Sequence, residues 1–261
     1  MALNITRQAC RFLAETDFGR TPPEISADLY KWLAELTGVK DPYFEIKRQD
    51  IKQALALYPE LKKRVLQAPD RLRKAIMFSL AGNIIDLGAG AASSWPQSES
   101  LFETEELALD DYELFRSDLK KAGTIVFLGD NAGETVFDRL LIEQLGRKVI
   151  YAVREGPIIN DASLEEARLS GLEEVAKVVS SGCQAPGMVI KQCSEEFTGI
   201  LKEAGLIISK GQGNYECLEQ ARGPFYFLLK AKCEVISRHL KVKQGSLILA
   251  RSKSFCPGLE L

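Results

Sequence analysis

A carboxylate and an amide stand side by side after an apolar strand pattern in the segment TIVFLGDNAGE, Thr124–Glu134. The β-branched and apolar run Thr124–Leu128 is typical of a strand that is covered on both faces of a parallel sheet. Asp130 and Asn131 follow at its carboxyl end, where open α/β sheets bind their ligands. Their oxygens suit a hard divalent cation such as Mg²⁺ or Mn²⁺. The helix pattern that starts at Thr135 adds free N–H groups, which favour a bound phosphate.

The same segment also has an ordinary structural interpretation, because Asp and Asn commonly cap helices in strand-to-helix turns. We assign Gly133 and Glu134, at the start of the helix, to the substrate-binding set. Glu134 can orient water or a substrate hydroxyl, or it can simply complement the helix dipole. Asp130 itself is either a metal ligand or a nucleophile that forms an aspartyl phosphate, and pairing with a second carboxylate favours the ligand role.

That second carboxylate follows the next strand, in KVIYAVREGPIINDA, Lys148–Ala162. The run Lys148–Val153 predicts a strand, and Asp161 comes just before the helical run Ser163–Leu169. Asp161 can complete a set of three oxygen ligands with Asp130 and Asn131, or it can serve only as the N-cap of the helix. The role of Arg154, at the strand end, stays open.

A lysine follows a third strand, in GLIISKGQGNYECL, Gly205–Leu218. Leu206–Ser209 predicts a short buried strand, and Lys210 at its end precedes two glycines and Asn214, which we also assign to the substrate-binding set. A lysine in such a loop can neutralise a phosphate oxygen while backbone N–H groups surround the others. The glycine spacing differs from that of a Walker loop. The alternative is a solvated loop lysine without a function.

Four motifs in this order and spacing resemble the metal-dependent damage-control phosphatases, a family once catalogued as a domain of unknown function, one eukaryotic member of which was named an acidic-residue methyltransferase. The motifs are GNIIDLG (Gly82–Gly88), GDNAGE (Gly129–Glu134), GPIIND (Gly156–Asp161) and KGQGNYE (Lys210–Glu216). The resemblance covers nearly the whole chain and implies a Rossmann-like core beside a helical subdomain.

The resemblance also implies roles for individual residues. It implies that a divalent metal, Mg²⁺ or Mn²⁺ with Co²⁺ or Ni²⁺ as further candidates, is held by Asp130, Asn131 and Asp161. Lys210 would face the substrate phosphate and act in catalysis. Asn83 would contact phosphate or substrate, with a helix C-terminal position as the alternative. The chain departs from the prokaryotic branch at its start, where a Cys-x-x-Cys pair is common but only MALN precedes Ile5.

The pattern of apolar residues changes near residue 116, which predicts two structural parts. Residues 1–116 repeat apolar residues at helical spacing, with a further, more buried helix over Arg71–Asn83. Residues 117–261 alternate short β-branched runs with helical segments, which predicts an α/β core with a mostly parallel, Rossmann-like sheet. The strands expected beyond those above are Val175–Ser180, Tyr226–Lys230 and Leu247–Ala250. We expect the helical part and the Ala89–Ser100 loop to contribute the contacts that select the substrate.

Composition excludes several classes of protein. The formal charge of -2 over 261 residues gives no basic field for nucleic acid. One histidine, His239, disfavours histidine triads and multi-histidine metal centres. Six cysteines without Cys-x-x-Cys spacing indicate reduced thiols. No apolar run is long enough to span a membrane, and Met1–Thr6 lacks an export pattern, so we expect a cytoplasmic protein. Its oligomeric state is not predicted.

The sequence therefore predicts a metal-dependent phosphatase that hydrolyses phosphate monoesters of small metabolites, such as sugar phosphates or related damaged or surplus intermediates. One alternative is an S-adenosylmethionine-dependent methyltransferase, because IIDLGAG (Ile84–Gly90) resembles the opening of a methyltransferase fold. Against it, SSWP follows where a helix should begin. The other alternative is a protein that binds a phosphorylated metabolite without turning it over.

Overall fold

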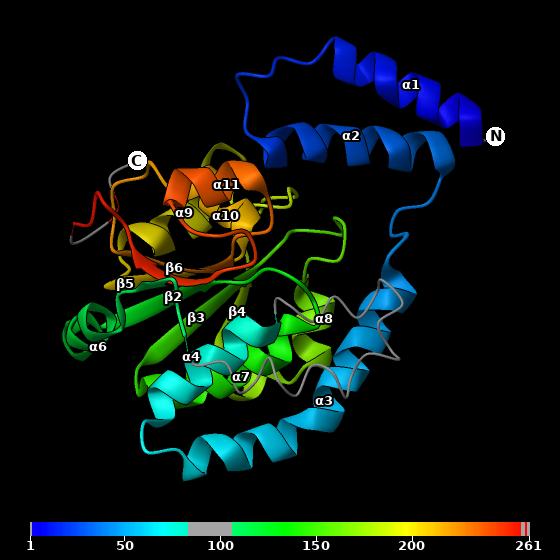
Figure 1. Cartoon of the computed structure of the whole chain (residues 1–261). Coiled ribbons are helices and arrows are strands. Elements are labelled where there is room, and N and C mark those ends of the chain that lie inside the picture. Colours follow the sequence, from blue (N-terminus) through cyan, green and yellow to red (C-terminus); the bar gives the residue numbers. More distant parts are fainter. Residues whose placement is uncertain (1, 83–105, 257–258, 260–261) are drawn as a thin grey trace.

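A seven-stranded sheet forms the centre of the protein (Figure 1). The computed structural model describes residues 2–82, 106–256 and 259. The strand order is β1-β7-β6-β5-β2-β3-β4, and every neighbouring pair is parallel except β6 and β7. The strands are β1 (Leu109–Asp110), β2 (Thr124–Leu128), β3 (Lys148–Val153), β4 (Lys177–Ser180), β5 (Leu206–Lys210), β6 (Phe225–Lys230) and β7 (Leu247–Arg251). The predicted α/β class with a mostly parallel sheet is confirmed.

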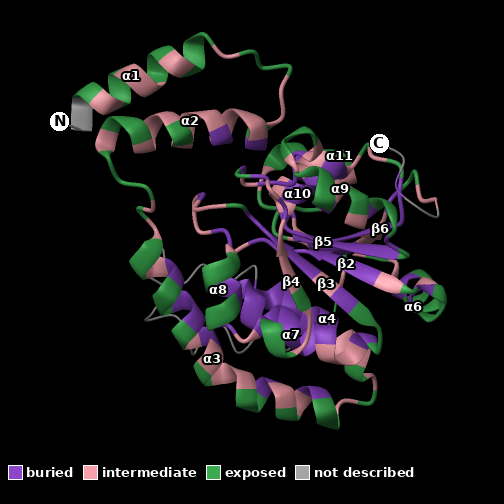
Figure 2. Ribbon diagram, turned by 180° about the vertical axis from the view of Figure 1, so that it is seen from behind, coloured by how far each residue is buried: buried purple, intermediate pink, exposed green. Residues whose placement is uncertain are grey.

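Helices cover both faces of this sheet, as the views in Figures 1 and 2 show. Successive side chains of a strand point to opposite faces, so Ile125 and Phe127 of β2 enter one hydrophobic core while Val126 and Leu128 enter the other. The helices are α1 (Ala2–Ala14), α2 (Pro22–Thr37), α3 (Phe44–Gln67), α4 (Arg71–Gly82), α6 (Tyr112–Lys121), α7 (Glu134–Leu145), α8 (Leu164–Leu169), α9 (Glu195–Lys202), α10 (Gln212–Leu218) and α11 (Glu234–Leu240).

The helices of the N-terminal part differ in how they meet the core. Figure 1 shows α1 and α2 as a helical pair that projects from the core, whereas α4 lies beside α7 and α3 packs against both. Every residue of α4 from Ala75 to Gly82 is buried, as expected for a helix that is apolar on nearly all sides. Ile51 and Ala54 of α3 belong to the same hydrophobic cluster as Phe127 of β2.

The order of the strands places a topological switch point between β5 and β2. From β2 the chain moves outward to β3 and β4, then returns to the other side of β2 with β5. Crevices at such points, beyond the carboxyl ends of the strands, are where open α/β sheets bind ligands. The segments after β2, β3 and β5 are the three that carry the predicted site residues.

A buried ion-pair group ties α3 to α8. Lys47 Nζ lies 2.7 Å from Asp41 Oδ2 and 2.8 Å from Glu166 Oε1, and the Lys47 side chain is fully buried. Burial alone would raise the pKa of Glu166, but hydrogen bonds from Lys47 and Ser163 lower it below its ordinary value. The ionised carboxylate is therefore favoured in the folded state.

We expect this group to make stability depend on pH. Because the folded pKa of Glu166 is below the unfolded one, its stabilisation is complete above the ordinary glutamate pKa of about 4.3 and disappears as the pH falls through the folded value. Thermal unfolding between neutral and acidic pH should show a shallower loss of Tm in Glu166→Gln than in the wild type. The exposed neighbour Glu165 is the control position, and equal pH slopes for Glu166→Gln and the wild type would refute the assignment.

Candidate active site at the ends of β2, β3 and β5

The loops after β2 and β3 are joined by backbone hydrogen bonds. Asn131 and Asp161 form an isolated antiparallel bridge. The Ala132 N–H donates to the Asn160 carbonyl at 2.8 Å, and the Ala162 N–H donates to the Asp130 carbonyl at 2.9 Å. The structure therefore brings together Asp130, Asn131 and Asp161, although Asp161 lies on a different strand end from the other two.

Neither helix that follows these loops is capped by the predicted ligands. The N-cap of α7 is Gly133, and no side chain caps it by hydrogen bonding. The N-cap of α8 is Ser163, which forms a capping box with Glu166. The alternative interpretation of these acidic and amide residues as simple helix caps is therefore wrong.

Arg154, at the end of β3, connects the two carboxylates. Its Nε donates to Asp161 Oδ2 at 2.7 Å, and its Nη2 lies 3.6 Å from Asp130 Oδ1. All three side chains are at least nine-tenths buried. Burial and the charge of Asp161 raise the pKa of Asp130 to about 6, although Arg154 lowers it. Burial likewise raises the pKa of Asp161 against the opposing effect of Arg154. The pair therefore concentrates negative charge that a cation would stabilise.

The side chain of Asn214, on α10, connects Arg154 to the ends of β2 and β5 through hydrogen bonds. Its Oδ1 accepts from Arg154 Nη2 at 3.0 Å, and its Nδ2 donates to the carbonyls of Gly129 (3.1 Å) and Lys210 (2.8 Å). Asn214 is fully buried. The predicted contact between Asn214 and substrate stays a prediction, and the observed contacts make this amide a link between β2, β3 and β5.

Lys210 points into the protein from the end of β5. Its Nζ donates to the Ser79 carbonyl at 2.9 Å, to Glu134 Oε2 at 2.9 Å and to Asp138 Oδ1 at 2.8 Å. Burial alone would lower the pKa of Lys210, but Asp138 and Glu134 raise it above its ordinary value. Because the side chain is fully buried, the alternative of a solvated loop lysine is wrong. Whether it also faces a substrate phosphate stays a prediction.

Glu134 joins this lysine to the predicted metal ligands. Its Oε1 accepts a hydrogen bond from Asn131 Nδ2 at 2.8 Å, while its Oε2 accepts from Lys210. Burial raises the pKa of Glu134 to about 7; Lys210 opposes the rise, and Asp130 and Asp138 add to it. Glu134 therefore fixes the nitrogen end of the Asn131 amide, which leaves the carbonyl oxygen as the end that a cation can use.

The backbone of Gly211 makes room for Asp130. At φ 80° and ψ 164° this residue occupies a region that is essentially restricted to glycine. A Cβ at this position would lie 1.9 Å from Asp130 Oδ2. Gly133 is also closely approached, since a Cβ there would lie 3.1 Å from Asp50 Cβ of α3.

The donor set fits a hard divalent cation. Asp161 Oδ1 is buried and has no hydrogen-bond partner among the described residues. Two carboxylates and an amide oxygen are ligands that Mg²⁺ and Mn²⁺ accept. Within residues 2–82, 106–256 and 259, no group of three or more His, Cys, Asp or Glu side chains could hold a metal. The third donor in this set is an amide, so the set does not depend on such a group.

Sequence reasoning missed Ser79 and Asp138, and it left Arg154 open. Ser79 and Asp138 lie inside helices α4 and α7, where no turn or strand end marks them. Asn83 and the methyltransferase-like segment Ile84–Gly90 lie outside the described residues, as does Ala89–Ser100. His239 is partly exposed on α11 and pairs with Glu219 at 2.6 Å, remote in sequence from these strand ends as expected.

Two further expectations concern cysteines and membranes. All six cysteines are free, in agreement with the reduced thiols that the sequence indicates. None of the helices in the described part of the chain is long and apolar enough to cross a membrane. The cytoplasmic location stays a prediction.

Several known proteins are similar to this chain in sequence and in fold. The sequence model of the damage-control phosphatase ARMT1-like domain matches residues 2–248. Damage-control phosphatase PH1575 of Pyrococcus horikoshii is 36% identical over 235 residues, which cover 88% of this chain and 79% of the relative. A damage-control phosphatase of Archaeoglobus fulgidus is 32% identical over 251 residues, with coverage of 92% and 86%. The crystal structure of the Pyrococcus DUF89 family protein matches with a TM-score of 0.84 at 33% identity, covering 96% of this chain and 91% of that chain.

Proposed function

We propose that the activity of this protein depends on a divalent cation. The premise is that the chain belongs to the damage-control phosphatase ARMT1-like family and is a phosphatase of damaged metabolites. The cation would be held by Asp130, Asn131 and Asp161. Mg²⁺ and Mn²⁺ are the first candidates, with Co²⁺ and Ni²⁺ next. The substrates would be phosphate monoesters of small metabolites, with sugar phosphates as the first group to assay.

The proposal of a cation site rests mainly on one observation. Asp161 Oδ1 is a buried carboxylate oxygen without a hydrogen-bond partner among the described residues, and a buried acceptor left unpaired costs about 1–3 kcal/mol. A bound cation would supply the missing partner. It would also account for two neighbouring buried carboxylates at a topological switch point, where ligands bind.

The chain's own residues then have distinct tasks. Glu134 orients the Asn131 amide, and Lys210 holds Glu134 in place, so Lys210 is proposed as a positioning residue for the ligand set. Arg154 supplies positive charge beside Asp130 and Asp161, which can also offset charge on a phosphoryl group. The positive end of the α7 dipole favours a phosphate nearby, although the Glu134 and Thr135 N–H groups already donate to the Asn131 and Ala132 carbonyls. When bound, the cation would polarise a phosphoryl oxygen and lower the pKa of a coordinated water.

Removing either carboxylate ligand should abolish metal-restored activity. We expect Asp130→Ala and Asp161→Ala to lower the rate by about 10²–10³ or more, because a charged contact of this kind typically contributes a few kcal/mol to the transition state. The assay is phosphate release from p-nitrophenyl phosphate and sugar phosphates after chelation, with Mg²⁺, Mn²⁺, Co²⁺ or Ni²⁺ restored one at a time.

The matched control is Glu155→Ala, which removes an exposed carboxylate next to Arg154 and should leave the activity unchanged. Circular dichroism would establish that each variant is folded. Full activity in folded Asp130→Ala and Asp161→Ala would refute the proposed ligands. Full activity of the wild type after exhaustive chelation would refute the metal dependence and leave the phosphatase assignment intact.

A further inference from the structure

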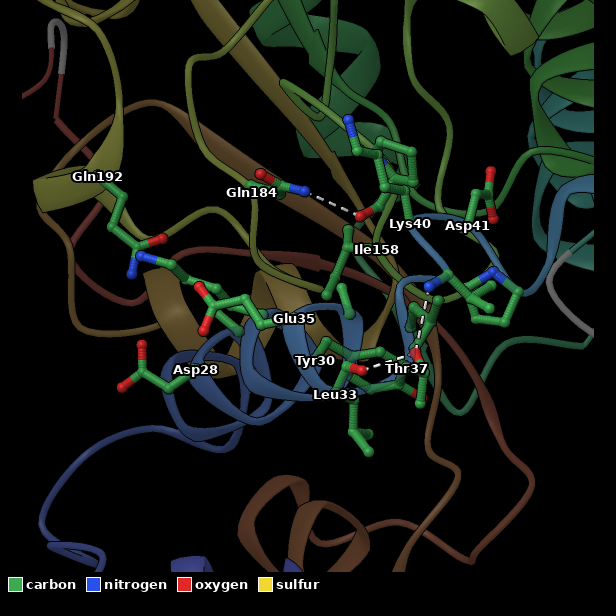
Figure 3. A pocket seen from close by; sticks show the side chains of 17 residues that line it. Asp28, Tyr30, Leu33, Glu35, Thr37, Lys40, Asp41, Ile158, Gln184 and Gln192 are labelled. Atoms are coloured by element: carbon green, nitrogen blue, oxygen red, sulfur yellow. Dashed lines mark hydrogen bonds between the residues drawn. The ribbon is translucent and has the colours of Figure 1, made fainter. Parts of the chain in front are cut away.

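A cavity of about 760 Å³ lies between α2 and the core. Its walls come from α2, from the segment 39–42 that follows it, and from the loop 157–159, with Gln184 and Gln192 at the side. Figure 3 shows α2, with Tyr30 and Thr37, on one side of the cavity and Ile158 and Gln184 of the core on the other. Sites for organic ligands usually measure about 300–1,000 Å³, so this cavity can hold a molecule much larger than a phosphate group.

Most of the exposed surface of the lining is apolar, but polar and charged side chains also contribute to the wall. The charged ones are Asp28, Lys31, Glu35, Lys40 and Asp41. Leu33, Ala34, Val39, Pro42 and Ile158 contribute hydrocarbon surface. The polar groups include the Tyr30 hydroxyl and the side-chain amides of Gln184 and Gln192. A few polar groups on an apolar wall are typical of sites that bury the organic body of a ligand and fix its orientation.

Part of the cavity wall comes from the loop that leads to Asp161. Pro157, Ile158 and Ile159 line it, and the Asp161 N–H donates to the Ile158 carbonyl at 3.1 Å. Gln184 Nε2 donates to the Pro157 carbonyl at 3.0 Å and so holds the start of the loop (Figure 3). Burial, a hydrogen bond with Tyr43 and the charge of Asp161 together raise the pKa of Tyr30.

The backbone of this loop is strained at Ile159. Its φ is 39°, an outlier for a β-branched residue. Such conformations cost of the order of 1–3 kcal/mol and cluster at ligand-binding sites. Ile159 lines the cavity two residues before Asp161, so the strained turn links the apolar wall to the carboxylate.

We propose that this cavity binds the organic body of the substrate, and that the preferred substrates are phosphomonoesters with an extended, largely apolar body rather than compact sugar phosphates. The inference rests on the proposed function, since it places the phosphate at Asp130 and Asp161. The loop 157–161 then sets the distance between the phosphate and the chain that fills the cavity. A compact polyhydroxylated body would leave most of the apolar wall unoccupied.

The test uses a series of primary alkyl phosphates with ethyl, butyl, hexyl and octyl chains, assayed on the metal-restored enzyme. A buried methylene contributes up to about fourfold in affinity, so kcat/KM should rise at least about tenfold from ethyl to octyl phosphate. Ala34→Trp places an indole ring against the wall of the cavity and should lower this octyl-to-ethyl ratio severalfold. Leu36→Trp, on the same helix but outside the lining, is the matched control and should keep the wild-type ratio.

A second variant tests the inference without adding bulk. Ile159→Gly removes the strained side chain and one apolar wall, so it should fold at least as stably as the wild type while the octyl-to-ethyl ratio falls. Calorimetric binding of octyl and ethyl phosphate to both proteins gives a readout that does not need turnover.

The outcomes separate the inference from the proposed function. Hydrolysis of all four esters at one kcat/KM, or an unchanged ratio in Ala34→Trp, overturns the cavity assignment and leaves the metal-dependent phosphatase intact. Binding that strengthens from ethyl to octyl and is lost in Ala34→Trp, without hydrolysis of any ester, overturns the inference that the cavity orients substrates for hydrolysis; the metal dependence is tested separately with p-nitrophenyl phosphate. A preference for sugar phosphates over octyl phosphate also overturns the inference.

Discussion

Replacing Lys210 by methionine is expected to lower the free energy of unfolding by about 3–5 kcal/mol. Lys210 Nζ is the buried cation between Glu134 and Asp138, at 2.9 and 2.8 Å. Methionine keeps most of the volume but leaves two buried carboxylates facing each other without a positive charge. Chemical denaturation followed by circular dichroism measures the change.

Two comparisons isolate the charge of Lys210. Adding Glu134→Gln and Asp138→Asn to Lys210→Met neutralises the group and should recover a large part of the lost stability. Lys62→Met removes a lysine that is 42% exposed and pairs with Glu143 at 2.8 Å, and it should cost no more than about 1 kcal/mol. If Lys210→Met costs as little as Lys62→Met, the buried ion-pair group does not stabilise the fold in this way.

Replacing Gly211 by alanine should lower phosphatase activity by about 10²-fold or more, because a misplacement of about 1 Å can have that effect on catalysis. The new Cβ would lie 1.9 Å from Asp130 Oδ2, so the carboxylate or the loop must move. The effect should appear both in the metal-restored rate and in the concentration of Mn²⁺ needed for half-maximal activity.

Gly146→Ala is the matched control for backbone strain. Gly146 also has a positive φ, 60°, but no atom lies within 4 Å of a Cβ built there. It should lose about 1 kcal/mol of stability while keeping full activity. Equal activity of folded Gly211→Ala and Gly146→Ala would show that the approach of Gly211 to Asp130 does not matter for the reaction.

The strands that carry the site could be predicted because their signal is local. Uninterrupted apolar runs that end in polar or glycine residues identify β2, β3 and β5, and the structure places all three at the predicted residues within a position or so. Parallel strands align their carboxyl ends, so polar residues after each strand meet at one edge of the sheet. β1 was not predicted, because two residues carry no periodic pattern.

The partners of Lys210 could not be predicted, because their signal is not local. Ser79 and Asp138 lie 131 and 72 positions away in the chain, inside helices whose sequence indicates only burial. The sequence places Lys210 after a strand, yet it cannot show that the side chain points toward α4 and α7 rather than into solvent. The cavity beside α2 could not be predicted for the same reason, because it forms where α2 meets the loop 157–159, which is distant in the sequence.

Binding of Mn²⁺ to chelator-treated protein tests the central claim most directly. Calorimetric titration should give one strong site per chain in the wild type. Folded Asp130→Ala and Asp161→Ala should bind at least about tenfold more weakly, which is the smaller of the effects expected even for a residue that only orients a ligand. No Mn²⁺ binding by the wild type, or equal affinity in all three proteins, would contradict a cation site formed by Asp130, Asn131 and Asp161.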